Sequence, residues 1–296
     1  MLIDILPTGE VVGGGPANTA RALARLGHEV DFIDGISSDR YGLMARKALL
    51  RDGVGLAHSL ESDKPTCTAT VTLDSHGVAS YEFLIDKTAT FDFNSSWLPD
   101  PSVFKPSVLH IGTLATIIEP GASQLFDWAL RVGEFAPIIF DPNIRPSVMG
   151  DKEIYSAAVE KWVSISSLVK VSDDDIKWLY PDETMDEVAH RWIAQGVSCV
   201  VLTRGAHGLI GITEHGMEEV NGTKTTVIDT VGAGDTVGAI IVEAVISHSV
   251  AGLQGHVLNS VLHKAAIAAG ITCSRAGAQP PYKHELTEAM ENNAVY

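Results

Sequence analysis

Along the chain, segments with helical spacing of apolar residues alternate with short, continuously apolar runs. Helical spacing is clear at residues 16–27 and 41–53, and the first segment has Pro16 at its expected start and Gly27 at its expected stop. Apolar runs that predict strands lie at 29–35, 107–112, 137–141, 168–171 and 198–203. Short apolar strands that alternate with helices are typical of a parallel sheet covered on both faces, so the pattern predicts an α/β fold.

Two regions depart from this alternation. Residues 66–85 contain two strand-like runs joined by Asp-Ser-His-Gly at 74–77, with no helix between them. Residues 1–10 also have the composition of a strand. We therefore predict a small antiparallel sheet attached to the larger one.

Composition narrows the classes of function. The 296 residues are 45% hydrophobic, enough for one large α/β domain with a small appendage. A formal net charge of −16 disfavours a nucleic-acid partner, which would need clustered Lys and Arg. The three cysteines are far apart, which indicates neither a zinc module nor a disulfide scaffold and favours a reducing compartment. No signal-peptide pattern or bilayer-spanning run is present, so we expect a cytoplasmic protein without a membrane partner.

The stretch Thr-Val-Gly-Ala-Gly-Asp at 230–235 is the first candidate for chemistry. It follows a strand-like run at 225–229 and precedes a helix that is apolar nearly all round. Glycines at the start of a helix let a ligand approach free N–H groups, which suits a phosphoryl group. Asp235 could accept a proton from an attacking hydroxyl beside such a group. An ordinary helix N-cap explains Asp235 as well, so both interpretations stay open.

The stretch Gly-Gly-Gly-Pro-Ala-Asn at 13–18 is the second candidate. Three glycines precede a helix whose first turn contains Asn18, and this amide could either face a polar ligand or act as a local cap. The P-loop, dinucleotide-fold, nucleophile-elbow and His-Glu-x-x-His motifs are absent, and the 11 histidines are scattered.

Together these stretches resemble the PfkB, or ribokinase-like, carbohydrate kinase family over nearly the whole chain. The motifs that carry the resemblance are, in order, LIDILPTGE, GGGPANTA, DPNIRP, LTRGAHG, DTVGAGDT and TCSRAGAQPP. The family implies a doubly wound, mostly parallel sheet with helices on both faces. It also implies one domain over 1–296, with a β-sheet lid formed by about 2–12 and 64–92. The implied activity is ATP-dependent phosphorylation of a sugar hydroxyl with Mg²⁺, and the lid makes a homodimer our expectation.

The resemblance also assigns site residues. Asp235 matches the catalytic base, and Gly232, Ala233 and Gly234 match the anion hole. The positions that match sugar-binding residues are Asp4, Gly14, Gly15, Asn18, Asn143 and Arg145. Those that match the nucleotide site are Thr203, Gly205, Gly208 and Lys170, and the 203–208 loop also has the pattern of a tight turn between strands.

Two metal sites are implied by the same resemblance. Many members have an Asn-x-x-Glu motif near magnesium, and the matching residues here are Ser172 and Asp175. We expect Asp175 to reach Mg²⁺ through water, although an acidic helix N-terminus explains the Asp173–Asp175 cluster equally well. Asp229 and the carbonyl of Val231 match a monovalent-cation site, for K⁺, that some members have.

The motifs are most similar to those of fructokinases. Kinases of 2-keto-3-deoxygluconate share the Asp-x-Asn-x-Arg pattern at 141–145, but they usually add an arginine in the lid, and the stretch YEFLIDKTATFDF has none. A buried carboxylate favours a bidentate arginine, so fructose is the predicted substrate. The alternatives are a keto-deoxy acid, ribose or nucleoside kinase of the same fold, and, in a different class, a non-catalytic sugar or nucleotide sensor.

Overall fold

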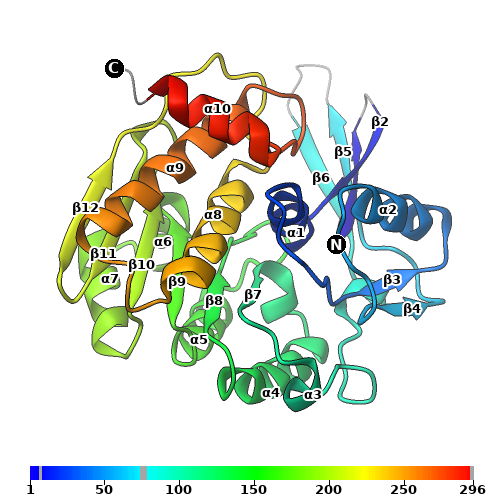
Figure 1. The fold of residues 1–296 in the computed structure, drawn as a ribbon. Helices are drawn as coiled ribbons and strands as arrows, with labels where there is room; N and C mark the ends of the chain where they lie inside the picture. The colour runs from blue at the N-terminus through cyan, green and yellow to red at the C-terminus, as the bar shows by residue number, and fades with distance from the viewer. Residues whose placement is uncertain (7–8, 74–78, 294–296) are drawn as a thin grey trace.

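The computed structural model describes residues 1–6, 9–73 and 79–293, and its centre is a large mixed sheet (Figure 1). Within the described residues this sheet has six strands in the order β12-β11-β10-β9-β8-β7. Strands β7 to β10 run parallel, whereas β11 and β12 are antiparallel to their neighbours. The strands span Leu109–Gly112 (β7), Ile138–Asp141 (β8), Leu168–Ser172 (β9), Cys199–Thr203 (β10), Leu209–Thr213 (β11) and Gly216–Val220 (β12).

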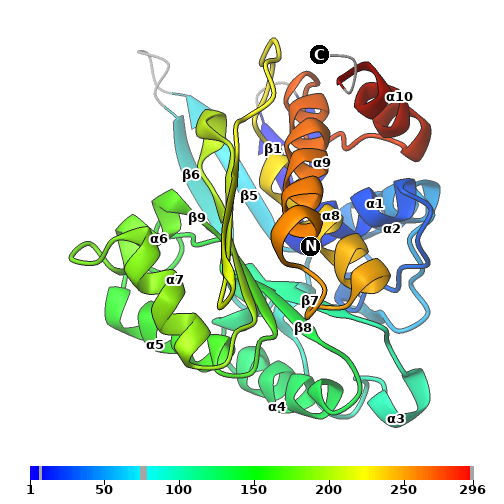
Figure 2. The same cartoon turned by 60° about the vertical axis from the view of Figure 1, so that its left-hand side comes forward.

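Helices cover both faces of this sheet, as Figure 2 shows most clearly. One layer contains α4 (Gly121–Gly133), α5 (Lys152–Val163), α6 (Asp173–Leu179) and α7 (Met185–Ala194). The opposite layer contains α1 (Gly15–Arg25), α8 (Ala233–His248) and α9 (Gly255–Cys273). The remaining helices are α2 (Arg40–Arg51), α3 (Pro101–Phe104) and α10 (Lys283–Asn293), with short 3₁₀ turns η1 (Ala89–Phe91), η2 (Thr113–Thr116) and η3 (Gly205–His207).

The apolar strands fill both layers because successive side chains point to opposite faces. Ile138 and Phe140 of β8 join the cluster under α4 to α7, which includes the buried Trp162 and Trp192. Ile139, between them, joins the cluster under α8 and α9. The continuously apolar runs therefore mark strands that are buried on both sides, and the predicted α/β architecture is confirmed.

A second, smaller sheet lies beside α1 and α2 in Figure 1. Its strand order is β2-β1-β5-β6, with β1 and β5 parallel and both outer pairs antiparallel. The strands are β1 (Leu2–Leu6), β2 (Gly9–Gly13), β5 (Thr68–Leu73) and β6 (Ala79–Leu84), and a separate short pair joins β3 (Gly35–Ser37) to β4 (Leu60–Ser62). The predicted pairing of two strands within 66–85 is present, while the turn at 74–77 lies outside the described residues. The first ten residues contribute parts of two strands, not one.

Two predicted strands are wrong. Residues 29–34 form only an isolated bridge between Asp31 and Gly55 before β3 begins at Gly35, since the backbone pairs with Gly55 at this one point. Among the described residues, 225–229 belong to no strand; Ile228 and Asp229 instead donate to the carbonyl of Cys273. Ile228 is 65% exposed, so this β-branched residue is not part of a buried sheet. Across the described helices, none is both long and apolar enough to cross a bilayer.

Candidate active site

Asp235 lies in the first turn of α8 but does not cap the helix. Gly232, with φ of 81°, is the N-cap residue, so Asp235 is the third helical residue. No side chain caps this helix end, and Asp235 is 8% exposed. The N–H of Ala233 donates to the Thr230 carbonyl at 3.3 Å, whereas no bond is recorded among the described residues for those of Gly234 and Asp235, which remain available to a ligand. The N-cap interpretation of Asp235 is wrong.

The carboxylate of Asp235 points toward α1. The side-chain amide of Asn18 donates to Asp235 Oδ2 at 2.8 Å, and the Thr19 hydroxyl donates to the Asp235 carbonyl at 3.2 Å. Asn18 is buried and does not serve as a local helix cap. The two glycine-rich stretches, 217 residues apart in sequence, thus meet at one carboxylate.

Gly15 packs directly beside this carboxylate. A Cβ at residue 15 would lie 3.0 Å from Asp235 Oδ1 and 2.9 Å from the amide nitrogen of Asn143. Because no side chain occupies this position, a polar ligand can approach both groups. The structure therefore brings Gly15, Asn18, Asn143 and Asp235 together, as the sequence predicted for a site that joins sugar and base.

The turn at Gly232 is packed against the loop that follows α9. A Cβ at residue 232 would lie 2.6 Å from the Cβ of Ala278, and Gly277 donates its N–H to Asp229 Oδ2 at 2.8 Å. Both the positive φ and this close approach require glycine at position 232. The shape of the α8 N-terminus therefore depends on where residues 277–280 lie.

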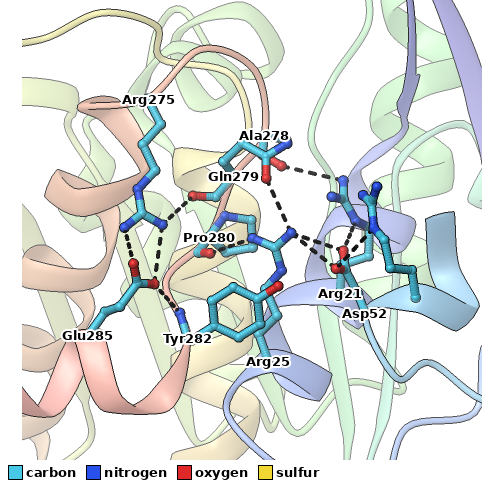
Figure 3. A network of polar contacts seen from close by, with 10 residues as sticks. Arg21, Arg25, Asp52, Arg275, Ala278, Gln279, Pro280, Tyr282 and Glu285 are labelled. Carbon is cyan, nitrogen blue, oxygen red and sulfur yellow. Dashed lines mark hydrogen bonds and ion pairs between the residues drawn. The ribbon is translucent and has the colours of Figure 1, made fainter.

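A buried ionic network fixes that loop (Figure 3). Arg21 donates to Asp52 Oδ2 at 2.6 Å, and Arg25 reaches both oxygens of the same carboxylate at 3.1 and 3.2 Å. Arg25 also donates to the Pro280 carbonyl at 2.8 Å, while Arg21 lies 3.4 Å from the Ala278 carbonyl. The network joins α1, the end of α2 and the loop beside Gly232, and our sequence analysis did not identify it. Arg21 and Arg25, charged residues within the predicted apolar helix, were the available signal.

A second ionic pair lies under the α8 N-terminus. Buried Lys170 on β9 donates to Asp141 Oδ2, at the end of β8, over 2.8 Å. The Lys170 ammonium would be 3.1 Å from a Cβ on Gly234, so it lies directly beside the predicted anion hole. Within the described part of the chain, the buried Oδ1 of Asp141 has no hydrogen-bond partner.

Asp175 and Ser172 form a capping box at the start of α6. This agrees with the interpretation of the Asp173–Asp175 cluster as an acidic helix N-terminus. The backbone N–H of Asp175 binds the Ser172 hydroxyl, while its carboxylate accepts from Ser172 N at 3.3 Å and from Ile144 N at 3.0 Å. Burial and the neighbouring Asp141 raise the pKa of Asp175, and Ser172 and Lys170 oppose that rise. Asp175 thus lies beside the Asp141–Lys170 pair, and a role near magnesium stays a prediction.

Burial raises the pKa of Asp235 to about 6. The hydrogen bond from Asn18 and the charges of Lys170 and Arg145 oppose this rise, whereas Asp141 adds to it. A carboxyl group with a pKa near neutrality is a better proton acceptor than an ordinary aspartate and is still ionised at pH 7.

Arg145 lies close enough to Asp4 and to Asp235 for its charge to act on both carboxylates. The charge of Arg145 lowers the pKa of both Asp4 and Asp235, although burial dominates and raises each value. The exposed guanidinium of Arg145 donates to Asn143 Oδ1 at 2.6 Å and to two backbone carbonyls, so it is partly committed to its own turn. Gly14, with φ of 97°, provides the turn from β2 into α1.

The residues predicted to bind the nucleotide lie at the same edge of the large sheet, where Thr203 pairs with Ser172. Thr203 ends β10, and the turn to β11 contains Gly205 and Gly208, both with positive φ, so the predicted turn between strands is confirmed. A Cβ on Gly208 would lie 2.0 Å from the Val220 carbonyl, which explains that glycine structurally. Asp229 accepts from Val231 N and Gly277 N, one at each oxygen, and its cation role stays a prediction.

A cavity of about 830 Å³ lies close by but does not include Asp235. It runs between the outer edge of β7 and residues 28–34, and Thr19 and His110 contribute to its lining. Since Asn18, Gly232 and Lys170 are not among its lining residues, the candidate active site rests on the side-chain contacts above and not on this cavity.

Comparisons with known proteins agree with this geometry. The family model described as "pfkB family carbohydrate kinase" matches residues 8–285. A fructokinase from Rhizobium leguminosarum bv. trifolii is 33% identical over 247 residues, covering 80% of this chain and 75% of that protein. A fructokinase from Vibrio alginolyticus is 30% identical, covering 81% and 80%.

Solved structures show the same fold. A fructokinase from Xylella fastidiosa with bound ATP superposes with a TM-score of 0.91 at 23% identity, covering 99% of this chain and 96% of that one. A fructokinase from Vibrio cholerae O395 with fructose, ADP and calcium gives 0.83 at 26% identity, covering 97% and 95%. With the match over residues 8–285, these likenesses establish that the chain belongs to the pfkB family of carbohydrate kinases.

Proposed function

We propose that this ATP-dependent carbohydrate kinase phosphorylates fructose, with Asp235 as the general base. The observation that carries the proposal is the position of Asp235: it is the third residue of a helix without a side-chain cap, and its carboxylate is held by Asn18. A base is thereby held next to free N–H groups that can bind a phosphoryl group. Phosphoryl transfer needs these two functions side by side.

In this mechanism the sugar hydroxyl approaches Oδ1 of Asp235, beside Gly15, and gives its proton to it. Asn143, Asp4 and Arg145 hold the other hydroxyls, and the small sheet covers the sugar as a lid. The N–H groups of Gly232 and Gly234 receive the growing charge of the transferred phosphoryl group, and that of Ala233 joins them by leaving the Thr230 carbonyl, to which it donates at 3.3 Å here. The Lys170 ammonium adds a positive charge beside Gly234. Thr203, Gly205 and Gly208 border the nucleotide.

The residues beside Lys170 fit a water-mediated contact to Mg²⁺. Each oxygen of Asp175 accepts one N–H and keeps a free lone pair, and Asp141 Oδ1 is unpartnered. Across the described residues, no group of three or more His, Cys, Asp or Glu side chains could hold a metal alone. This agrees with an ion held mainly by phosphate oxygens and water. Magnesium would neutralise phosphate charge there, and Asp229 with Val231 is the proposed K⁺ site.

The substrate is tested by steady-state kinetics at saturating Mg-ATP with fructose, 2-keto-3-deoxygluconate, ribose and a nucleoside. The curated relatives named above are called fructokinases, and an acidic substrate would add to the carboxylates already present. We expect kcat/KM to be highest for fructose. A higher value for the keto acid, lost selectively in Arg145→Ala, would assign Arg145 to a carboxylate and contradict the proposal. Binding of sugar without ADP release would indicate a sensor.

A homodimer is proposed through the lid sheet. Val11 on β2 and Leu84 on β6 leave 37% and 48% of their surface exposed at its two outer strands. Light scattering after size-exclusion chromatography tests this: a mass of twice 31.5 kDa is expected, and a monomer at micromolar concentration would contradict it.

A further inference from the structure

The two oxygens of the Asp235 carboxylate have different surroundings. Oδ2 accepts the Asn18 amide at 2.8 Å, whereas Oδ1 lies beside Gly15 and no hydrogen bond to it is recorded among the described residues. A carboxylate with both oxygens free can rotate about its Cβ–Cγ bond. The Asn18 contact removes that freedom and distinguishes one oxygen from the other.

We infer that Asn18 is a positioning residue for the catalytic base: it holds Oδ2 and so presents Oδ1 to the sugar hydroxyl. This inference rests on the proposed function, in which Asp235 is the base. It gives Asn18 a task beyond its predicted contact with sugar. Among the described residues, the buried amide oxygen of Asn18 has no hydrogen-bond partner, while the nitrogen binds Asp235.

The helix that carries Asn18 is held at several points. Thr19 binds the Asp235 carbonyl, and one turn later Arg21 and Arg25 join Asp52 and the loop at 278–280 (Figure 3). Because these contacts fix α1 directly after Asn18, the amide does not follow the carboxylate if it rotates. A rigid donor of this kind is what an oriented base requires.

The same contact also controls the charge state of the base. An N–H donor stabilises the ionised carboxylate, so the Asn18 bond lowers the pKa of Asp235 against the effect of burial. The other charged groups that act on Asp235 are Lys170 from β9 and Arg145 from the loop after β8, which stabilise the ionised form, and Asp141 from β8, which opposes it. His110 of β7 faces the next turn of α8, at Gly238. Removing the Asn18 donor must therefore raise the pKa of Asp235.

The test is a titration of the Asp235 carboxyl carbon by NMR in protein with ¹³C-labelled aspartate. Its resonance is identified by its absence in Asp235→Asn. The variants are Asn18→Ala, which removes the donor, and Asn18→Asp, which keeps the size but places a like charge there. Thr19→Val is the matched control, since it removes a neighbouring bond to the Asp235 backbone and leaves the carboxylate contact intact.

We expect the Asp235 pKa to rise by about one unit in Asn18→Ala and by more in Asn18→Asp. In Thr19→Val it should match the wild type. An unchanged titration in Asn18→Ala, or an equal shift in Thr19→Val, would overturn the inference. This readout needs no substrate, so it is independent of which sugar is phosphorylated.

The second readout is the pH dependence of kcat at saturating sugar and Mg-ATP. In Asn18→Ala its acid limb should move to higher pH together with the carboxyl titration. At the alkaline plateau kcat should recover to within about tenfold of the wild type. The remaining loss is expected because the carboxylate is no longer oriented by Asn18. A shifted titration with an unshifted acid limb would show that Asp235 is not the base, and the inference would fall with that assignment.

Discussion

Replacing Gly232 with alanine tests the anion hole through its geometry. The added Cβ would lie 2.6 Å from the Cβ and 2.9 Å from the Cα of Ala278. Carbon atoms normally approach to about 3.5–4.0 Å, so these groups must separate by about 1 Å. Arg21 and Arg25 hold the Ala278–Pro280 loop, so the Gly232 turn is the part that moves. A left-handed φ of 81° adds about 1–2 kcal/mol of strain for alanine.

A displacement of about 1 Å at a phosphoryl-binding turn should lower kcat by about 10²-fold. The assay is ADP release coupled to NADH oxidation, with sugar and Mg-ATP both saturating, and circular dichroism to confirm folding. The KM for fructose should change little, because Asp4 and Arg145 lie on other elements.

The matched control is Gly255→Ala. Gly255 also has a positive φ, of 51°, but a Cβ there would meet nothing within 4 Å. This variant carries the backbone strain without the collision, so it should lose stability and keep its kcat. If folded Gly232→Ala has a kcat within threefold of Gly255→Ala, the turn does not form the anion hole.

Three further predictions follow from the site. Because burial raises the pKa of Asp235 to about 6, kcat should fall as the pH drops through that value and the base is protonated; a rate that stays constant down to pH 4 would exclude this carboxylate as the base. Gly234→Val would push against the Lys170 ammonium, 3.1 Å from the Cβ position, and should reduce kcat far more than sugar affinity; normal turnover by the folded variant would argue against the anion hole. Asp52→Asn should lower the free energy of unfolding in urea by about 3–5 kcal/mol, because two buried guanidiniums lose their counter-charge. The exposed Asp63→Asn should change it by less than about 0.5 kcal/mol, and equal effects would show that the buried network contributes no stability.

The sequence predicted the parts of this fold that depend on local pattern. Apolar runs such as 137–141 and 198–203 are strands buried on both faces, as their nearly continuous apolar composition predicts. The 225–229 run has the same β-branched composition but is not a strand. A strand requires a neighbour with free backbone groups, and composition does not show whether the fold supplies one.

The sequence predicted which residues belong to the site better than it predicted which of them touch each other. The motifs identified Asp235 and Asn18 separately, but nothing local indicates that they bind each other across 217 residues. The Asp235 role was ambiguous for the same reason: whether an acid after a glycine turn is a cap depends on which glycine begins the helix. Arg21, Arg25 and Asp52 gave no motif, since a buried charge network is recognised only when its partners are placed.

Asp235→Asn tests the central claim most directly. The substitution keeps the size of the side chain and can keep the contact with Asn18, but it removes the proton acceptor. We expect kcat to fall by about two to four orders of magnitude, with ATP affinity measured by calorimetry near the wild-type value. The melting temperature should not fall, because a neutral amide replaces a carboxylate whose ionisation burial opposes. A folded Asp235→Asn protein that turns over within a few-fold of the wild type would contradict the assignment of Asp235 as the base.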